Sequence, residues 1–445
     1  GRALMQLPDE VQQALAKLEA AGFPAYVVGG AVRDHLRGVT PHDFDLCTAA
    51  RPEEITAVFA GERVIETGVK HGTVTILLAG EPLEITTFRV EGRYSDCRHP
   101  DRVRFVREIE ADLGRRDFTV NAMAYSPARG LIDPFGGRMD LERRVLRAVG
   151  DPETRFSEDA LRILRGLRMA AETGFTLEQD TAAAVRALAP TLTRVAPERL
   201  SAELLRLLCG RFAGRVLREY TEVIGVILPE ILPMKGFRQH NQHHRYDVLE
   251  HTLRALEQIP ATPVLRLAAL YHDAGKPRCF TLDENGVGHF YGHPKISAAL
   301  AEQRCLALRL PNAVREEVVF LAHVHDVPID GTQKTIRRRL AQYGELRLRH
   351  VLMMKKADGV GRGTHPEYIG QYQQLEAALN EVLRQDACLS VRSLALGGRA
   401  LMALGLQGPA IGEMQRHLLE LVLDDPARNT PETLAALARQ HMEET

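Results

Sequence analysis

The sequence predicts an α+β fold, with a small mixed sheet in a head domain followed by a largely helical remainder. Helical and strand-like patterns alternate over about the first 130 residues, and helical periodicity then runs almost without interruption from about residue 140. The chain has 445 residues, which is too long for one ordinary core. We therefore expect several domains.

The head begins with an amphipathic helix that ends at a glycine, and strands and a second helix follow. Two β-rich runs separated by a Gly-Glu-Pro turn then predict a hairpin. In order, we expect a helix over 7–22, strands over 25–30 and 44–49, a helix over 51–60, and hairpin strands over 72–80 and 82–90.

Helical periodicity is clearest over 157–174 and 198–210 in the second part of the chain. A polar, histidine-rich stretch at 233–248 marks a boundary before another helical unit. Glycine pairs and a Gly-Pro step then separate shorter helices near the C-terminus. These patterns predict helical neck, body and tail regions.

Composition narrows the functional classes. Hydrophobic residues make up 45% and charged residues 26%, which is ordinary for a globular protein, and the net charge of −1 excludes a globally basic nucleic-acid binder. The six cysteines form no CxxC pair, so we expect reduced thiols. The sequence has no membrane-spanning run and no signal pattern, and the residues before Met5 resemble an expression remnant. We expect a cytoplasmic protein without a membrane partner.

Two aspartates one residue apart provide the first chemical motif. On a strand, Asp43 and Asp45 would point to the same face. Carboxylates held that close repel one another unless a cation lies between them, and their oxygen atoms suit Mg²⁺. A pair of water-solvated loop aspartates is the alternative.

Gly29 and Gly30 lie between a predicted strand and a predicted helix. A glycine turn at a helix N-terminus lets the backbone approach an anion closely. Phosphate beside a metal-binding aspartate pair indicates phosphoryl or nucleotidyl transfer. A turn that requires glycine for structural reasons alone is the alternative.

Further polar residues complete a candidate nucleotide site. Glu84 lies on a later strand and is a candidate third acidic residue, with a surface role as the alternative. Within RRDFTVNAMAY, Asp117 and Asn121 could bond to sugar hydroxyls while Arg116 pairs with phosphate.

Five motifs together resemble a known family. GGAVRDHLRG with HDFDL, then RRDFTVNA, DPFGGRMDL, EDALRILR and ERLSAELL occur in the order found in class II tRNA nucleotidyltransferases, the CCA-adding enzymes and bacterial poly(A) polymerases. The resemblance covers about half of the chain. It implies a polymerase-β-type nucleotidyltransferase head followed by helical neck, body and tail.

The resemblance also implies roles. Asp43 and Asp45 would hold two Mg²⁺ ions, and the RNA 3′-hydroxyl would be the nucleophile. Arg33 and Asp34 would fix the triphosphate and the glycine turn. The sugar contacts would come from Arg116, Asp117 and Asn121.

In that family an aspartate and an arginine select the base. Asp159 and Arg162 are three residues apart, so on one helix they would share a face, with Arg165 a turn further along. Cytosine and adenine both present an amino donor beside a ring-nitrogen acceptor, whereas uracil and guanine present the opposite pattern. The pair would therefore accept CTP and ATP. Residues Glu198, Arg199 and Glu203 would brace this helix.

The stretch 90–105 corresponds to a loop that, in the resembling enzymes, is needed for the switch from C to A and is short in CC-adding members. Here it has full length. Complete CCA addition is therefore favoured, and an A-adding enzyme or poly(A) polymerase remains the alternative. A metal-dependent phosphohydrolase with an RNA-binding head is a second alternative.

A second series of histidines and aspartates resembles an HD-superfamily phosphohydrolase domain. The resemblance implies that the core metal ligands are His251, His272, Asp273 and Asp358. His293 and His323 would serve a second metal or the phosphate, while His289 and His325 are nearby alternatives, and His325 could replace His323. The resemblance implies phosphatase, phosphodiesterase or 2′,3′-cyclic phosphodiesterase activity, which could repair damaged tRNA 3′ ends before CCA addition. A vestigial fold is the alternative.

The expected domains are a nucleotidyltransferase head over 5–140, a helical neck and body over 141–236, an HD domain over 237–372 and an RNA-binding tail over 373–445. We expect tRNA, CTP and ATP as substrates, Mg²⁺ in the head, and Mg²⁺, Mn²⁺, Ni²⁺ or another divalent ion in the HD domain. The sequence leaves monomer and homodimer open.

Overall fold

A computed structural model describes residues 5–65, 68, 71–91, 103–363, 368–385 and 388–445. The chain divides into two compact units, Gly1–Pro229 and Glu230–Thr445, and each is described by itself. The loop predicted to control the switch from C to A lies mostly at 92–102, outside the described residues.

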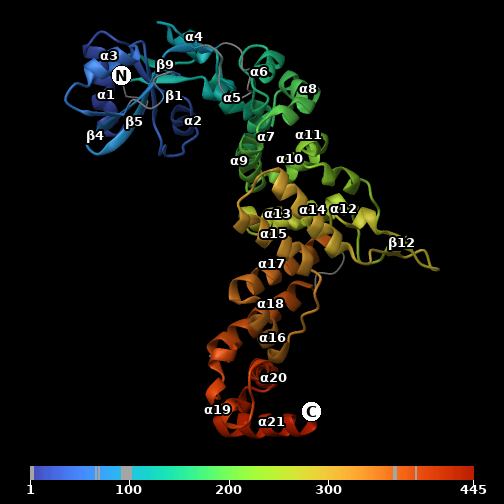
Figure 1. Ribbon diagram of the computed structural model, residues 1–445. Helices are drawn as coiled ribbons and strands as arrows, with labels where there is room; N and C mark the ends of the chain where they lie inside the picture. The colour runs from blue at the N-terminus through green and yellow to red at the C-terminus, as the bar shows by residue number, and fades with distance from the viewer. Residues whose placement is uncertain (1–4, 66–67, 69–70, 92–102, 364–367, 386–387) are drawn as a thin grey trace. The chain divides into compact units, whose positions relative to one another are not determined.

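A seven-stranded mixed sheet forms the core of the head, with strand order β3-β4-β5-β2-β1-β8-β9. Figure 1 labels β1, β4, β5 and β9 of this sheet. The β2–β5 pair is parallel, and the other pairs are antiparallel. This confirms the predicted mixed sheet. The strands are β1 (Ala25–Val28), β2 (Asp45–Thr48), β3 (Arg63–Ile65), β4 (Thr73–Leu78), β5 (Glu81–Thr87), β8 (Ala124–Ser126) and β9 (Gly130–Ile132).

The predicted hairpin is present as β4 and β5. Leu78 pairs with Glu81, so the turn consists of Ala79 and Gly80, both with positive φ, at 51° and 80°. Two central residues with positive φ are typical of the tight turns that suit the strand twist. A separate pair is formed by β6 (Arg89–Glu91) and β7 (Val103–Phe105).

The head helices are short apart from the first. They are α1 (Asp9–Ala20), α2 (Gly30–Leu36), α3 (Pro52–Val58), α4 (Ile109–Leu113) and α5 (Gly137–Arg143). In α1 the buried residues Val11, Ala14, Leu15 and Leu18 recur at helical spacing, which confirms the amphipathic pattern.

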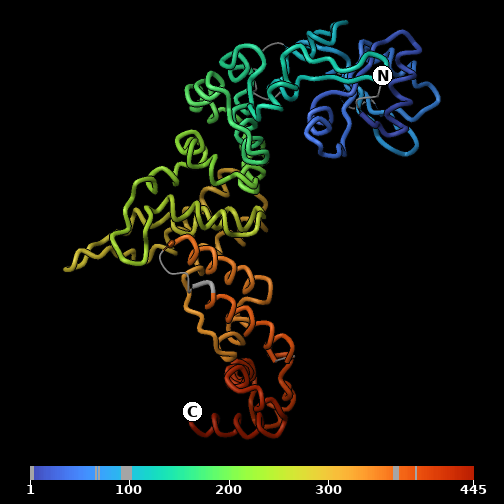
Figure 2. Tube along the Cα trace, turned by 180° about the vertical axis from the view of Figure 1, so that it is seen from behind, coloured from blue at the N-terminus to red at the C-terminus, as the bar shows by residue number. Residues whose placement is uncertain are grey.

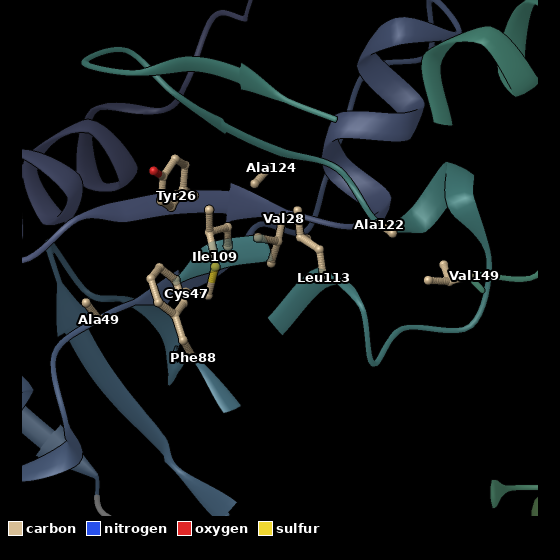
Figure 3. Packing of buried hydrophobic residues seen from close by; sticks show 10 residues of the cluster. All are labelled: Tyr26, Val28, Cys47, Ala49, Phe88, Ile109, Leu113, Ala122, Ala124 and Val149. Carbon is tan, nitrogen blue, oxygen red and sulfur yellow. The ribbon is translucent and has the colours of Figure 1, made fainter. Parts of the chain in front are cut away.

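One hydrophobic cluster fixes the centre of the sheet to α4. Tyr26 and Val28 lie two residues apart on β1, so they face the same side, where Ile109 and Leu113 of α4 cover them (Figure 3). The rings of Tyr26 and Phe88 lie 6.1 Å apart between centroids. This packing holds the strand that leads into Gly29.

The rest of the first unit is helical, apart from the short parallel pair β10 (Val145–Leu146) and β11 (Thr176–Leu177). The predicted helix over 157–174 is two helices, because the chain is extended at Asp159 (φ −148°, ψ 105°). The helices are α6 (Pro152–Glu158), α7 (Leu161–Thr173), α8 (Gln179–Leu188), α9 (Pro197–Leu208), α10 (Ala213–Glu219) and α11 (Thr221–Ile227).

The helices of the second unit surround a histidine-rich centre. A hairpin extends from these helices (Figure 1, Figure 2). The hairpin strands are β12 (Thr281–Leu282) and β13 (Gly288–His289). The helices around the centre are α12 (Val248–Gln258), α13 (Pro263–Tyr271), α14 (His293–Ala307), α15 (Asn312–Val324) and α17 (Glu345–Arg362).

The C-terminal helices form two further clusters in this unit. Their bounds are α16 (Gln333–Tyr343), α18 (Tyr368–Arg384), α19 (Gly398–Ala403), α20 (Pro409–Asp424) and α21 (Pro431–Glu444). Buried Arg337 of α16 donates from Nε to the Leu423 carbonyl of α20 at 2.9 Å, which ties the two clusters together.

Across the described residues, no helix has the length and hydropathy of a membrane span. The five described cysteines are free thiols.

Two candidate functional sites

The head site is built on the turn between β1 and α2. Gly29 has φ 71°, a conformation that favours glycine, and it precedes the first residue of α2. A Cβ atom at Gly29 would lie 3.4 Å from Nη1 of Arg116. The glycine therefore allows the arginine to lie directly over the turn.

A cavity of about 270 Å³ opens beside this turn. Its lining joins residues of α2, β2 and α7 to the RRDFTVNA segment, although these are distant in sequence. The lining residues are Gly29, Gly30, Arg33, Asp45, Arg115, Arg116, Asp117, Asn121, Arg162 and Arg165. Apart from Arg115, all are residues that the sequence analysis selected.

Hydrogen bonds order the polar wall of this cavity. Arg33 Nη1 donates to Asn121 Oδ1 at 2.7 Å, and Asn121 Nδ2 donates to Asp117 Oδ1 at 3.2 Å. Burial opposes ionisation of Asp117, but the positive charges of Arg165 and Arg162 and bonds from the Phe118 amide and Asn121 outweigh it, so the pKa of Asp117 is lowered. Asp117 is therefore a charged acceptor at neutral pH.

Only one of the two predicted acids lies on β2, so they do not share a strand face as expected. Asp45 is the first residue of β2, and Asp43 is exposed on the preceding loop. Partial burial raises the pKa of Asp45, Arg116 opposes the shift, and the charge of Asp43 adds to it. A carboxylate that is disfavoured by its neighbouring carboxylate gains from a cation, so the pair fits the Mg²⁺ ions predicted for it.

Glu84 lies on the neighbouring strand. The parallel register pairs Leu46 with Ile85, and one step back it sets Asp45 beside Glu84. Both side chains are exposed, whereas Leu46 and Ile85 are buried. Glu84 therefore lies on the same face of the sheet and at the same level as Asp45. This is where a third carboxylate would have to lie to share a metal ion with Asp45.

The structure corrects the geometry expected for Asp159 and Arg162. They do not share a helix face, because Asp159 is an extended residue after the end of α6 and α7 begins at Leu161. Asp159 is 6% exposed and accepts from Arg199 Nη2 at 2.9 Å, outside the lining of the cavity. Arg162 lines the cavity and donates from Nη1 to Glu158 Oε2 at 2.6 Å.

The predicted brace is nevertheless in contact with α7. Besides the Arg199 bond, Glu203 Oε2 accepts from Arg168 Nε at 2.7 Å, and Glu203 Oε1 lies 3.5 Å from Arg165 Nε. These bonds fix the orientation of α7 relative to α9. Arg165 is thereby held between Glu203 and Asp117.

The sequence analysis missed two supports of the cavity wall, Arg115 and Asp112. Asp112 of α4 is fully buried and lies 3.3 Å from Arg116 Nη2 and 3.5 Å from Arg115 Nε. The sequence does contain a signal for these contacts. Asp112 stands three residues before Arg115 and four before Arg116, which are the spacings at which side chains meet on a helix.

The second site is a buried cluster of imidazoles and carboxylates in the second unit. His251 Nε2 lies 2.8 Å from Asp358 Oδ1 and 3.1 Å from Asp273 Oδ2, and His272 Nε2 lies 3.1 Å and 3.2 Å from the same two atoms. The four predicted core residues therefore come together from α12, the end of α13 and α17.

The ring orientations fit a divalent metal. Nδ1 of His272 lies within hydrogen-bond distance of the Ala269 carbonyl, and the His293 and His325 rings use their Nδ1 atoms in the same way on Phe290 and Ala322. A ring that donates from Nδ1 presents an Nε2 lone pair, which is the tautomer that metal sites use. Although burial opposes its charged form, the carboxylates Asp273 and Asp358 raise the pKa of His272 to about 10, so without a metal Nε2 carries a proton that a divalent ion would replace. The cluster thus attracts a cation.

A second ligand group shares Asp273. It contains His293 and His325, whose Nε2 atoms lie 3.1 Å and 3.6 Å from Asp273 Oδ1. The place expected for His323 is therefore taken by His325, because the end of α15 turns His325 inward and leaves His323 exposed. His289 pairs with Asp283 on the hairpin, at 2.9 Å.

Residues that the sequence analysis did not select complete this site. A cavity of about 330 Å³ contains Lys276, Arg362 and His244 beside the ligands. Lys276 Nζ lies 3.1 Å from Asp273 Oδ2, and Arg362 Nη2 lies 3.0 Å from Asp358 Oδ2. Burial and the charges of Lys276 and His251 lower the pKa of His244 to about 3, so this ring is neutral.

Comparison with known families gives three matches along the chain. The poly A polymerase head domain matches residues 25–147, the probable RNA and SrmB-binding site of polymerase A matches 174–234, and the HD domain matches 242–362. A CCA-adding enzyme of Streptococcus gordonii is 49% identical over 451 residues, covering 98% of this chain and 99% of that protein. The chain belongs to the CCA-adding enzyme family. The predicted family is confirmed.

Other CCA-adding enzymes support this membership. That of Levilactobacillus brevis is 34% identical over 97% of this chain and 98% of its own length. The relative from Leuconostoc mesenteroides is 49% identical over 48% of this chain, and the match spans about half of that protein, 54%.

Solved structures confirm the fold. The crystal structure of the Bacillus stearothermophilus CCA-adding enzyme in complex with CTP has a TM-score of 0.72 and 29% identity, covering 99% of this chain and 100% of that one. The Thermotoga maritima CCA-adding enzyme complexed with tRNA has a TM-score of 0.61 at 20% identity, over 98% of this chain and 96% of that one, which supports the fold alone.

Proposed function

We propose that this protein adds CCA to tRNA 3′ ends from CTP and ATP and releases pyrophosphate. The observation that carries the proposal is the head cavity, where a glycine turn, several arginines, Asp117 and Asn121 surround Asp45. Arginines match triphosphate oxygen atoms, and the Asp117–Asn121 pair offers acceptors and donors to a ribose. Membership of the CCA-adding family supports the same reaction.

In this reaction the RNA 3′-hydroxyl oxygen forms a bond to the α-phosphorus of the nucleotide. The bond from that phosphorus to the bridging oxygen breaks, pyrophosphate leaves, and the hydroxyl proton passes to solvent. Asp43 and Asp45 would hold two Mg²⁺ ions, with Glu84 beside them. Bound Mg²⁺ would supply charge neutralisation at the attacking and leaving oxygens. Arg33 and Arg116 would orient the triphosphate.

Base selection would rest on Arg162 and Asp159. Arg162 already reaches the cavity, whereas the Asp159 carboxylate is held by Arg199. We propose that Asp159 meets the base through a movement between α6 and α7, since the extended residue between these helices is their hinge. The amino group of cytosine or adenine would then find an acceptor at the position where uracil and guanine carry a carbonyl oxygen, which cannot donate.

The test is product sequencing. A tRNA that lacks its 3′ end is incubated with CTP alone, ATP alone and both. We expect addition of two C residues with CTP and a complete CCA end with both. Long A tails with ATP would instead establish the poly(A) polymerase alternative, and absence of incorporation would favour the phosphohydrolase alternative.

A second function is supported by the metal-ligand cluster of the second unit. We propose that it hydrolyses phosphate esters, including 2′,3′-cyclic phosphates at RNA ends. Water oxygen would bond to phosphorus, the bond to one sugar oxygen would break, and that oxygen would take up a proton. Lys276 and Arg362 would neutralise the phosphate. His251, His272, Asp273 and Asp358 would hold Mn²⁺, Mg²⁺ or Ni²⁺, which would supply an activated water.

Hydrolysis of adenosine 2′,3′-cyclic phosphate with each of these metals tests this second function. Release of adenosine monophosphate by the wild type, but not by Asp273→Asn, is expected. No release with any of the metals would indicate a vestigial site.

We further propose that the protein is located in the cytoplasm, where tRNA is available. The helical regions would contact tRNA mainly through its phosphates and its shape.

A further inference from the structure

The hairpin β12–β13 carries an aromatic pair at the mouth of the HD cavity. Tyr291 follows β13, is 74% exposed, and comes two residues before the metal-ligand candidate His293. Its ring is stacked on that of His289, with an interplanar angle of 9° and 5.2 Å between centroids. Both residues line the cavity that contains Asp273 and Asp358.

The base of the hairpin is firmly packed. The Gly288 amide donates to the His240 carbonyl at 2.7 Å, and a Cβ atom at Gly288 would lie 2.1 Å from the Gln239 carbonyl oxygen. Phe290 packs against Phe280 at 5.3 Å between centroids. His289 is further held by Asp283. The aromatic pair is therefore positioned by the fold, although Tyr291 itself is exposed.

An exposed tyrosine alone needs no explanation, because single apolar side chains are common on protein surfaces. Tyr291 differs because its ring is stacked on that of His289. It also borders a cavity that is lined by two cationic side chains and by candidate metal ligands. The cavity of about 330 Å³ lies in the range of small-ligand pockets. Flat aromatic faces bind nucleobases by stacking, which is tolerant of base identity.

We propose that Tyr291 and His289 form a stacking platform for a nucleobase, so that the HD site takes a nucleotide, free or at an RNA 3′ end. The base would lie on Tyr291 while its phosphate extends toward Lys276, Arg362 and the ligand cluster. The proposal rests on the phosphohydrolase function proposed above and names its substrate class. A phosphate ester without a nucleobase would not make the contact with Tyr291.

The chain contains no tryptophan, so Tyr291→Trp provides a single fluorescent reporter at the platform. Adenosine monophosphate is expected to quench this fluorescence on stacking, whereas ribose 5-phosphate leaves it unchanged. Leu282→Trp is the matched control, because Leu282 is 57% exposed on the same hairpin and does not line the cavity. Absence of quenching, or equal quenching at both positions, would overturn the platform.

Titration of the same reporter with a short RNA ending in a 3′-phosphate distinguishes the two sources of the nucleotide. Tighter binding than adenosine monophosphate would identify an RNA end, and weaker binding a free nucleotide. Equal failure of both ligands would overturn the proposal.

Kinetics separate the platform from the catalytic proposal. Tyr291→Ala is expected to raise KM for adenosine 2′,3′-cyclic phosphate about tenfold with kcat retained, because the base would lose its stacking contact. Tyr291→Phe and Leu282→Ala should retain the wild-type KM, and KM for methyl riboside 2′,3′-cyclic phosphate, which has no base, should not change in Tyr291→Ala. An equal rise for both substrates would overturn the platform. If the wild-type protein hydrolyses neither substrate but the Tyr291→Trp variant shows the quenching, only the catalytic function is overturned.

Discussion

The two sites differ in how completely the protein assembles them. In the head, five arginines surround the cavity, and the acidic residues lie at the exposed start of β2 and on β5. In the second unit, four predicted ligands are already within contact distance of one another, and three of them are almost fully buried. Among the described residues, such close ligand groups occur only around Asp273.

This difference indicates two ways of acquiring a metal. Mg²⁺ keeps several waters and commonly binds through one or two carboxylates plus substrate phosphates, so an open acidic pair beside arginines suits ions that arrive with a nucleotide. A buried set of imidazoles and carboxylates suits a more tightly held transition metal. We therefore expect the head site to gain its metal together with the substrate, and the HD site to bind its metal without one.

The largest expected effect lies in the head. Asp45→Asn should lower CTP and ATP incorporation about a thousandfold, because the acidic pair supplies several kcal/mol of charge stabilisation. Incorporation of radiolabelled nucleotide measures it. Glu81→Gln, an exposed acid on β5, is the control and should retain activity. Wild-type incorporation by Asp45→Asn would remove the assigned role, and adenosine 2′,3′-cyclic phosphate hydrolysis should be unaffected.

The next effect concerns the buried pair behind base selection. Arg199→Met leaves the Asp159 carboxylate buried without this partner and should lower the free energy of unfolding by about 3 kcal/mol, measured by urea denaturation. Arg206→Met is the matched control on α9, since its pair with Glu172 is exposed and worth about 0–1 kcal/mol. Equal losses in both variants would mean that burial of Asp159 does not govern stability.

The third effect is the stabilisation of the folded protein by a metal bound at the HD site, and it is somewhat smaller than the loss expected for Arg199→Met. A metal at a hundred times its dissociation constant stabilises the folded protein by about 2.7 kcal/mol. Mn²⁺ should therefore raise the melting temperature of the wild type, and Asp273→Asn should abolish the increase. Exposed His323 supplies the control, as His323→Ala should respond like the wild type. A lost response in His323→Ala, with a normal one in His325→Ala, would reverse the assignment.

The smallest expected effect is pH dependence in the head. Because the pKa of Asp117 is lower in the folded protein, its ionisation contributes stability that is complete above the unfolded value of about 3.9. That contribution is lost as the pH falls through the folded pKa. The difference in unfolding free energy between wild type and Asp117→Asn should hold from pH 7 to pH 5 and shrink in more acidic urea titrations. A constant difference down to pH 2 would contradict it.

Local patterns predicted most elements correctly. The β4–β5 hairpin and α1 could be predicted from the sequence, because the turn glycine and the hydrophobic spacing that determine them lie within a few residues of one another. The helix over 157–174 was predicted wrongly as continuous. Its apolar spacing is helical, but tertiary bonds hold Asp159 extended, with Arg199 on another helix as the partner. Propensity does not contain that contact.

The sequence by itself determined which residue types were available: the paired aspartates, the glycine turn, the arginines and the ordered histidine series. Tertiary structure alone decided which of them meet. It selected His325 over His323, brought Arg115 and Arg165 to the same cavity, and set Asp45 level with Glu84 through a parallel strand pair. The physical reason is that helix ends and strand registers are fixed by packing between distant segments, which local patterns do not contain.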